Sequence, residues 1–124
     1  MNETNELSRI TGCSNRLVLA VNDTLNVISG KWKFPIIASL LHGKKRFKEL
    51  QDNISRITPR MLSKELKELE LNGIISRTVY DTTPVLIEYE LTPSGESLKE
   101  VIEQMVKWGL MHRNISFSEE QTAP

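Results

Sequence analysis

Residues 44–92 read KKRFKELQDNISRITPRMLSKELKELELNGIISRTVYDTTPVLIEYELT, and this stretch decides the fold. Its first part predicts a short helix, because three apolar residues recur at helical spacing: Phe47, Leu50 and Ile54. A three-residue turn then leads to Thr58-Pro59, where Thr is a favoured N-cap and Pro is favoured at the first helical position. A second helix is predicted from here to Asn72, with Gly73 ending it. The pattern is typical of a helix-turn-helix.

Two strands follow the second helix. The first is predicted at about 75–80 and the second at 85–91, with the turn DTTP (81–84) between them. The second strand alternates, and one of its faces is formed by Val85, Ile87, Tyr89 and Leu91. The predicted fold class is therefore mainly α with a small antiparallel β-hairpin, which is the winged helix-turn-helix.

Further helices are predicted on both sides of this unit. One spans 14–28, and another spans about 32–41 with Pro35 in its first turn. The last helix spans about 93–112 and opens with a second Thr-Pro pair. Its apolar residues cover more than the one stripe that a small core needs. It is expected to bury Leu98, Val101, Ile102, Met105, Trp108 and Met111.

The 124 residues predict one domain at 13–112, flanked by a loose polar arm at 1–12 and a polar tail at 113–124. The longest apolar run, FPIIASLL (34–41), is far shorter than the roughly 20 residues of a membrane span. The polar amino-terminal segment does not resemble a signal peptide. A single cysteine excludes an internal disulfide framework. The expected setting is the reducing cytoplasm.

The helix predicted to start at Thr58-Pro59 has two chemically different sides. Its apolar side covers roughly 60° of arc and is formed by Leu62, Leu66 and Leu69. Its opposite side is cationic over a similar arc and is formed by Arg60, Lys64 and Lys67. Such a face is usually a solvated surface. Here the preceding turn and the following hairpin favour DNA binding, because the second helix of a helix-turn-helix enters the major groove.

Positive charge is concentrated around this helix. Residues 44–77 carry nine bases against five acids, a net charge of +4, while the rest of the chain carries −4. Arg60 could read guanine through two hydrogen bonds, whereas lysines and hydroxyls are less selective. The basic segment GKKRFK (43–48) is either a solvated loop or a phosphate clamp beside the groove. The candidate DNA-binding residues are Thr58, Pro59, Arg60, Ser63, Lys64, Lys67, Lys44, Lys45, Arg46, Arg77, Thr82 and Thr83.

Several segments between Cys13 and His112 form a specific combination. They are ISGKWK (28–33), RFKEL (46–50), ITPRMLSKELKELE (57–70), NGIISRTVY (72–80), EYELTPSG (88–95) and KWG (107–109). No single segment is diagnostic, but GKW followed by RFKEL and a later LTP-x-G turn is specific in combination. Together they resemble the HxlR family of bacterial, MarR-like winged helix-turn-helix transcriptional regulators.

The resemblance implies a homodimer that binds double-stranded DNA. Members of this family act more often as repressors than as activators, so repression is expected. The family dimerises through its first and last helices, here around 14–28 and 94–112. A two-fold dimer would place two recognition helices about 34 Å apart on a pseudo-palindromic operator. Plain core packing is the alternative explanation for the apolar last helix. The expected interface residues are Leu17, Val21, Leu25, Val101, Met105, Trp108 and Met111.

The sequence departs from the family pattern at two places. Family wings usually carry a basic residue just before the second strand, whereas DTTPVLI (81–87) has none. Asp81 would repel phosphate, and Thr82 and Thr83 could at most donate a hydrogen bond to it. The family's cysteine is commonly followed by Pro, but Ser14 stands here. Sequence specificity is therefore expected mainly from the second helix of the helix-turn-helix, and less from the wing.

Cys13 is the candidate for redox sensing. Several family members sense oxidants or electrophiles through a cysteine at this position. A thiolate just before a helix is stabilised by the helix dipole, and Arg16 lies one turn away. As the only cysteine, it could form an intersubunit bond or a mixed disulfide with a small thiol. The alternatives are an inert cysteine at the dimer interface, or a regulator controlled by a small apolar ligand in the dimer crevice.

Enzyme chemistry is not predicted. His42 and His112 have no partner at metal-ligand spacing, and the chain has no glycine-rich phosphate loop. We therefore expect no catalytic residue, cofactor, metal or membrane partner. The remaining alternative to DNA binding is a winged helix that serves as a protein–protein interaction module. The acidic residues around the basic segment and the wing without bases favour that alternative.

Overall fold

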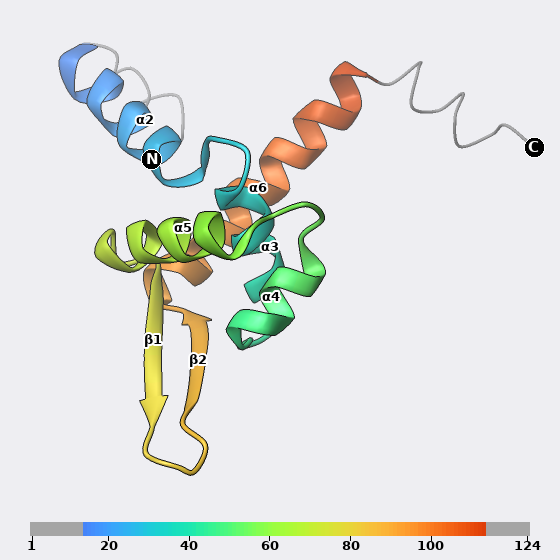
Figure 1. The fold of residues 1–124 in the computed structure, drawn as a ribbon. Coiled ribbons are helices and arrows are strands. Elements are labelled where there is room, and N and C mark those ends of the chain that lie inside the picture. Colours follow the sequence, from blue (N-terminus) through green and yellow to red (C-terminus); the bar gives the residue numbers. More distant parts are fainter. Residues whose placement is uncertain (1–13, 114–124) are drawn as a thin grey trace, which may run out of the picture.

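The computed structural model describes residues 14–113. The proposed arm at 1–12, Cys13 and the tail beyond Arg113 lie outside these residues. Within them the chain is mainly helical with one two-stranded antiparallel sheet, as the sequence predicts (Figure 1). The elements are α2 (Ser14–Ile28), α3 (Lys33–Leu40), α4 (Phe47–Asn53), α5 (Pro59–Leu71), β1 (Ile75–Tyr80), β2 (Leu86–Leu91) and α6 (Pro93–His112).

The core lies between α3, α4, α5 and the base of the hairpin. The predicted apolar side of α5 is confirmed, because Leu62, Leu66 and Leu69 are all buried. Each such side chain stabilises the fold by about 1.5–3 kcal/mol through its removal from water. The largest fully buried side chains are Ile36, Ile37, Leu40, Leu50, Leu62, Leu66, Leu69 and Ile75.

The start and end of α5 follow from its local sequence. The Thr58 hydroxyl accepts a hydrogen bond from the Met61 backbone N–H at 3.1 Å, and Pro59 occupies the first helical position. Gly73 adopts a φ of 74°, which ends the helix in a conformation that favours glycine. Arg56 in the preceding turn also has a positive φ, of 70°, which is uncommon for a residue with a Cβ.

The start of α6 is fixed to the turn between α5 and β1. The Thr92 hydroxyl accepts from the Gly95 backbone N–H and lies 2.6 Å from the Gly73 carbonyl oxygen, to which it donates. The Thr92 N–H donates to the Ile74 carbonyl at 2.9 Å. A Cβ at Gly95 would collide with that same carbonyl oxygen. Only glycine therefore allows the first turn of α6 to approach so closely.

The hairpin has a regular antiparallel register from Ile75 opposite Leu91 to Tyr80 opposite Leu86. The strand begins at Leu86, one residue later than predicted, and Val85 is exposed in the turn. The rest of the predicted inner face is correct: Tyr89 and Leu91 are buried, and Ile87 packs against the core. Lys45 forms an isolated bridge with Tyr89 through two backbone hydrogen bonds of 2.8 and 2.9 Å.

The helix predicted at about 32–41 spans Lys33–Leu40, with Trp32 as its N-cap, so its bounds agree to within one residue. The predicted burial of the last helix is wrong. The last helix was expected to bury six apolar residues, but only Ile102 is buried and Leu98 is half-buried. The others are exposed, and the outer part of α6, like α2, extends away from the core of the molecule (Figure 1). These exposed residues are Val101, Met105, Trp108 and Met111. No helix among residues 14–113 is both long enough and apolar enough to cross a membrane.

Candidate nucleic-acid interface

The exposed side of α5 carries most of the residues that the sequence suggested for DNA binding. Leucines anchor the opposite side in the core, so this side must point outward. Lys64 is 70% exposed and lies 3.7 Å from a Glu68 carboxylate oxygen, which is a weak ion pair. The exposed candidates on and just before α5 are Thr58, Pro59, Arg60, Ser63, Lys64 and Lys67.

The structure brings α5 and the hairpin together around an open depression of 290 Å³. Arg77 of β1 meets the exposed side of α5 here, although the two lie in different elements. The lining of the depression contains two basic side chains, one carboxylate, one serine hydroxyl and the buried Leu66 and Tyr89. Its lining residues are Ser63, Leu66, Lys67, Glu70, Arg77 and Tyr89.

The basic segment before α4 lies against the edge of β2 and does not line this depression. The Lys44 ammonium is 3.5 Å from Glu88, and the nearby Glu88 carboxylate raises the pKa of Lys44 above its ordinary value. Lys45 is half-buried, and its backbone is paired with Tyr89. Arg46 is exposed, and its backbone N–H donates to the Glu49 carboxylate at 2.8 Å. The hairpin therefore neutralises part of this charge.

The wing turn offers few hydrogen-bond donors. Thr82 and Thr83 are exposed, but the Thr82 hydroxyl donates to the Pro84 carbonyl oxygen at 2.7 Å within the turn itself. Asp81 is exposed at the same turn. The Thr82 hydroxyl proton is therefore already used within the turn, and the smaller contribution of the wing stays a prediction.

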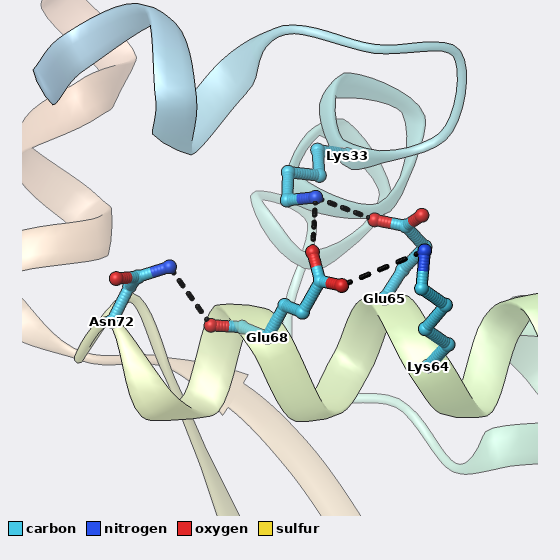
Figure 2. A network of polar contacts seen from close by, with 5 residues as sticks. All are labelled: Lys33, Lys64, Glu65, Glu68 and Asn72. Carbon is cyan, nitrogen blue, oxygen red and sulfur yellow. Dashed lines mark hydrogen bonds and ion pairs between the residues drawn. The ribbon is translucent and has the colours of Figure 1, made fainter. Parts of the chain in front are cut away.

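Two of the three glutamates of α5 are paired with a lysine of α3. The Lys33 ammonium lies 2.7 Å from Glu65 and 2.7 Å from Glu68, and Figure 2 shows it between the two carboxylates. The Lys33 and Glu65 side chains are only 13% and 14% exposed, whereas Glu68 is 39% exposed. Figure 2 also shows Lys64 reaching the second oxygen of Glu68 and Asn72 donating to the Glu68 backbone carbonyl.

The pKa values of this cluster reflect the pairing. Burial lowers the pKa of Lys33, but the hydrogen bonds with Glu65 and Glu68 outweigh it, so the net pKa is raised. The hydrogen bond with Lys33 and the charge of Lys33 lower the pKa of Glu68 below its ordinary value. Both shifts favour the charged forms of Lys33 and Glu68.

Sequence reasoning missed two residues near the proposed interface. Lys33 was noticed only as part of ISGKWK (28–33), because nothing local links it to glutamates 32 and 35 residues away. Arg56 was counted among the bases but given no role. The sequence already places this basic residue in the turn just before α5, and the structure shows that it is exposed.

The predicted dimer residues lie on the two projecting helices. Leu17 is half-buried, while Val21 and Leu25 of α2 are exposed. The predicted residues of α6 are exposed as well: Val101, Met105, Trp108 and Met111. Trp108 stacks on His112 at the outer part of α6, with ring centroids 4.8 Å apart. Residues 14–113 contain no group of three or more His, Cys, Asp or Glu side chains that could hold a metal ion. The Cys13 hypothesis falls outside these residues.

Comparisons with known proteins agree with this arrangement. The model of the HxlR-like helix-turn-helix family matches residues 27–116. The HTH-type transcriptional regulator YtcD of Bacillus subtilis (strain 168) is 45% identical over 96 residues, which are 77% of this chain and 76% of YtcD.

Two solved structures are also similar. The redox regulator HypR in its reduced form is 42% identical with a TM-score of 0.72, and the match covers 80% of this chain and 98% of HypR. The reduced transcriptional regulator YodB from B. subtilis is 38% identical with a TM-score of 0.69, covering 72% of this chain and 87% of YodB. These relatives confirm that the chain is not an enzyme. It belongs to the HxlR-like helix-turn-helix family and is a transcriptional regulator.

Proposed function

We propose that this regulator is a cytoplasmic homodimer that represses its target gene by binding a pseudo-palindromic operator. The α5 helix of each protomer enters the major groove. The observation that carries the proposal is the exposed cationic side of α5, held outward by three buried leucines. Two glutamates of the same helix are paired with Lys33, so they compete little with phosphate. Repression is assigned because members of the family that the sequence resembles act more often as repressors than as activators.

The residues of the interface have different proposed roles. Arg60, in the first turn of α5, reads a guanine edge through two hydrogen bonds. Thr58 accepts from Met61, which leaves its hydroxyl proton free to donate to a phosphate, and Pro59 adds only van der Waals contact. The remaining candidates bind the DNA backbone, with the smallest contribution from the wing. They are Ser63, Lys64, Lys67, Arg77, Lys44, Lys45, Arg46, Thr82 and Thr83.

Dimerisation is supported by the apolar surface of α2 and α6. Trp108 is 66% exposed and Met111 is 75% exposed, although both are large apolar side chains. Many large apolar side chains exposed on two helices favour an interface. A two-fold axis between the projecting helices would bury the two sets of side chains against each other. The proposed interface residues are Leu17, Val21, Leu25, Val101, Met105, Trp108 and Met111.

We assign control of the dimer to Cys13, which directly precedes α2. The support comes from HypR, a redox regulator that is 42% identical to this chain. An oxidant such as diamide would accept two electrons and two protons from the two Cys13 thiols of a dimer. The products are one intersubunit disulfide and the hydrazine. The bond would join the two α2 helices and change the spacing of the two recognition helices.

Enrichment of duplexes from a random-sequence pool tests DNA binding. We expect the purified wild-type protein to enrich two inverted half-sites whose centres are about 10 base pairs apart. A control protein with Arg60, Lys64 and Lys67 all replaced by Met should enrich nothing. If the wild type also enriches no sequence at low salt, DNA binding is contradicted and the protein–protein module becomes the better account.

Diamide treatment tests the role of Cys13. Operator affinity of the wild-type dimer should change after treatment and recover with a thiol reductant. The Cys13→Ser dimer should bind equally well with and without diamide. If wild-type affinity does not respond, or if Cys13→Ser responds equally, Cys13 is not the sensor. Control by a small apolar ligand in the dimer crevice would then be the remaining account.

A further inference from the structure

Lys33 joins two helices that are distant in sequence. It is the first residue of α3, and its ammonium is 2.7 Å from carboxylate oxygens of Glu65 and Glu68 on α5 (Figure 2). The two glutamates are three residues apart, so they lie on the same side of the helix. One ammonium group therefore contacts two successive turns of α5. This arrangement restrains both the rotation of α5 about its axis and its position along α3.

The same contact changes the charge that α5 presents. Residues 59–71 contain three bases and three acids, so the isolated helix has no net charge. Lys33 supplies a fourth positive charge and draws two of the acids toward α3. Glu70 is then the only α5 carboxylate that is not within 4.0 Å of Lys33 or Lys64 in the described residues. The balanced helix thereby gains a net positive surface.

Lys64 depends on this arrangement. It lies 3.7 Å from Oε2 of Glu68, while Lys33 holds Oε1 of the same carboxylate at 2.7 Å. Because Lys33 supplies most of the counter-charge, Lys64 stays 70% exposed and only loosely paired. Without Lys33, Glu68 would attract Lys64 more strongly and so weaken its contact with phosphate without removing it.

We propose that Lys33 is a positioning residue for DNA binding, which orients α5 and compensates Glu65 and Glu68 without touching DNA itself. This inference rests on the proposed function, since it requires that α5 bind DNA. It identifies a determinant of affinity on α3, outside the helix-turn-helix and outside the wing.

The first test measures affinity for a duplex that the wild-type protein has enriched from a random pool. Lys33→Met should weaken binding about fivefold to tenfold at fixed salt, because each protomer loses one net positive charge near several phosphates. The slope of log affinity against log salt should stay unchanged, since Lys33 contacts no phosphate. Lys67→Met, the matched phosphate-contact variant, should reduce that slope by about two for a dimer. Lys99→Met controls for the change in net charge and should bind like the wild type.

The Lys33→Arg variant separates compensation from a merely structural role. It keeps the charge and should bind within about threefold of the wild type. A purely structural Lys33 would change the free energy of unfolding, but not the affinity of the folded protein. Equal affinity of folded Lys33→Met and wild type would overturn the proposal, as would a failure of Lys33→Arg to restore binding. If the wild type enriches no duplex at all, the proposed function fails instead.

A second pair of variants serves if Lys33→Met does not fold. Lys33→Met/Glu65→Gln retains only the half-exposed Glu68, and Lys33→Met/Glu65→Gln/Glu68→Gln removes it as well. Neither variant leaves the partly buried Glu65 charge uncompensated. The variant that keeps Glu68 should bind more weakly, by about fivefold, than the variant with both glutamines. Equal affinities would show that Glu68 needs no compensation, and the proposal would be wrong.

Discussion

Arg60 is the second residue of α5 and is exposed at the end of the helix that we place in the groove. Replacing it with Ala should weaken operator binding by about 1–3 kcal/mol and relax specificity at one base position. The measurement is affinity for the enriched duplex and for variants of it at each position. Lys48→Ala, which removes an exposed charge from α4, should leave the base preference intact. An equal loss on every duplex would make Arg60 a phosphate contact.

Glu68 links acid stability to the contact with Lys33. Its pKa is lowered from the ordinary value of 4.5 by the hydrogen bond with Lys33 and by the charge of Lys33. The stabilisation is therefore complete above pH 4.5 and is lost as the pH falls through the lower, folded-state pKa. Urea denaturation should show that wild type exceeds Glu68→Gln in free energy of unfolding at pH 7. This difference should shrink in acid. A difference that stays constant to pH 3 would contradict the assignment.

The α6 helix depends on a glycine that the local sequence could not explain. Gly95→Ala should lower the free energy of unfolding by about 1–3 kcal/mol, because the new methyl group meets the rigid Ile74 carbonyl. Ser94→Ala changes the neighbouring exposed position and should alter stability by less than about 0.5 kcal/mol. Thermal or urea unfolding of both variants would decide the matter. Equal stability of Gly95→Ala and wild type would rule out the close approach.

Elements with local signals were predictable from the sequence. The N-cap pair Thr58-Pro59 located α5, and the stop at Gly73 was confirmed by its positive φ. The first strand was predicted at its observed bounds, 75–80. The contact between Lys33 and α5 was not predictable, because an ion pair between residues 32 positions apart depends on how α3 and α5 pack. The depression between α5 and β1 was missed for the same reason.

The burial of α6 shows where periodicity misleads at the scale of the whole molecule. An apolar stripe identifies a surface to be covered, but it does not say whether the same chain covers it. Ile102 is the last buried apolar residue of α6 in the described part of the chain, and most of the large apolar side chains of this helix are exposed. The outer part of α6 extends away from the other elements (Figure 1). The distribution of charge along the sequence has the same limit. It locates the basic region at residues 44–77, but it does not show which acidic and basic side chains form ion pairs.

The proposed dimer interface can be tested at the scale of the whole molecule. Met105→Glu places a charge on an exposed apolar surface that we assign to the interface, so the dimer dissociation constant should rise by about tenfold or more. Sedimentation velocity across a concentration series measures it. Gln104→Glu adds the same charge at the neighbouring polar position and should have a smaller effect. An unchanged association for Met105→Glu would remove α6 from the interface.

The salt dependence of operator binding tests the central claim most directly, namely that the exposed side of α5 binds DNA phosphates. Lys64, Lys67 and Arg77 alone would give a dimer about six charged phosphate contacts, so log affinity should fall against log salt with a slope of about −5, or steeper if Lys44, Lys45 and Arg46 also contact phosphate. Replacing Lys67 with Met should make this slope shallower by about two. A slope near zero, or one that the Lys67 replacement leaves unchanged, would contradict the account.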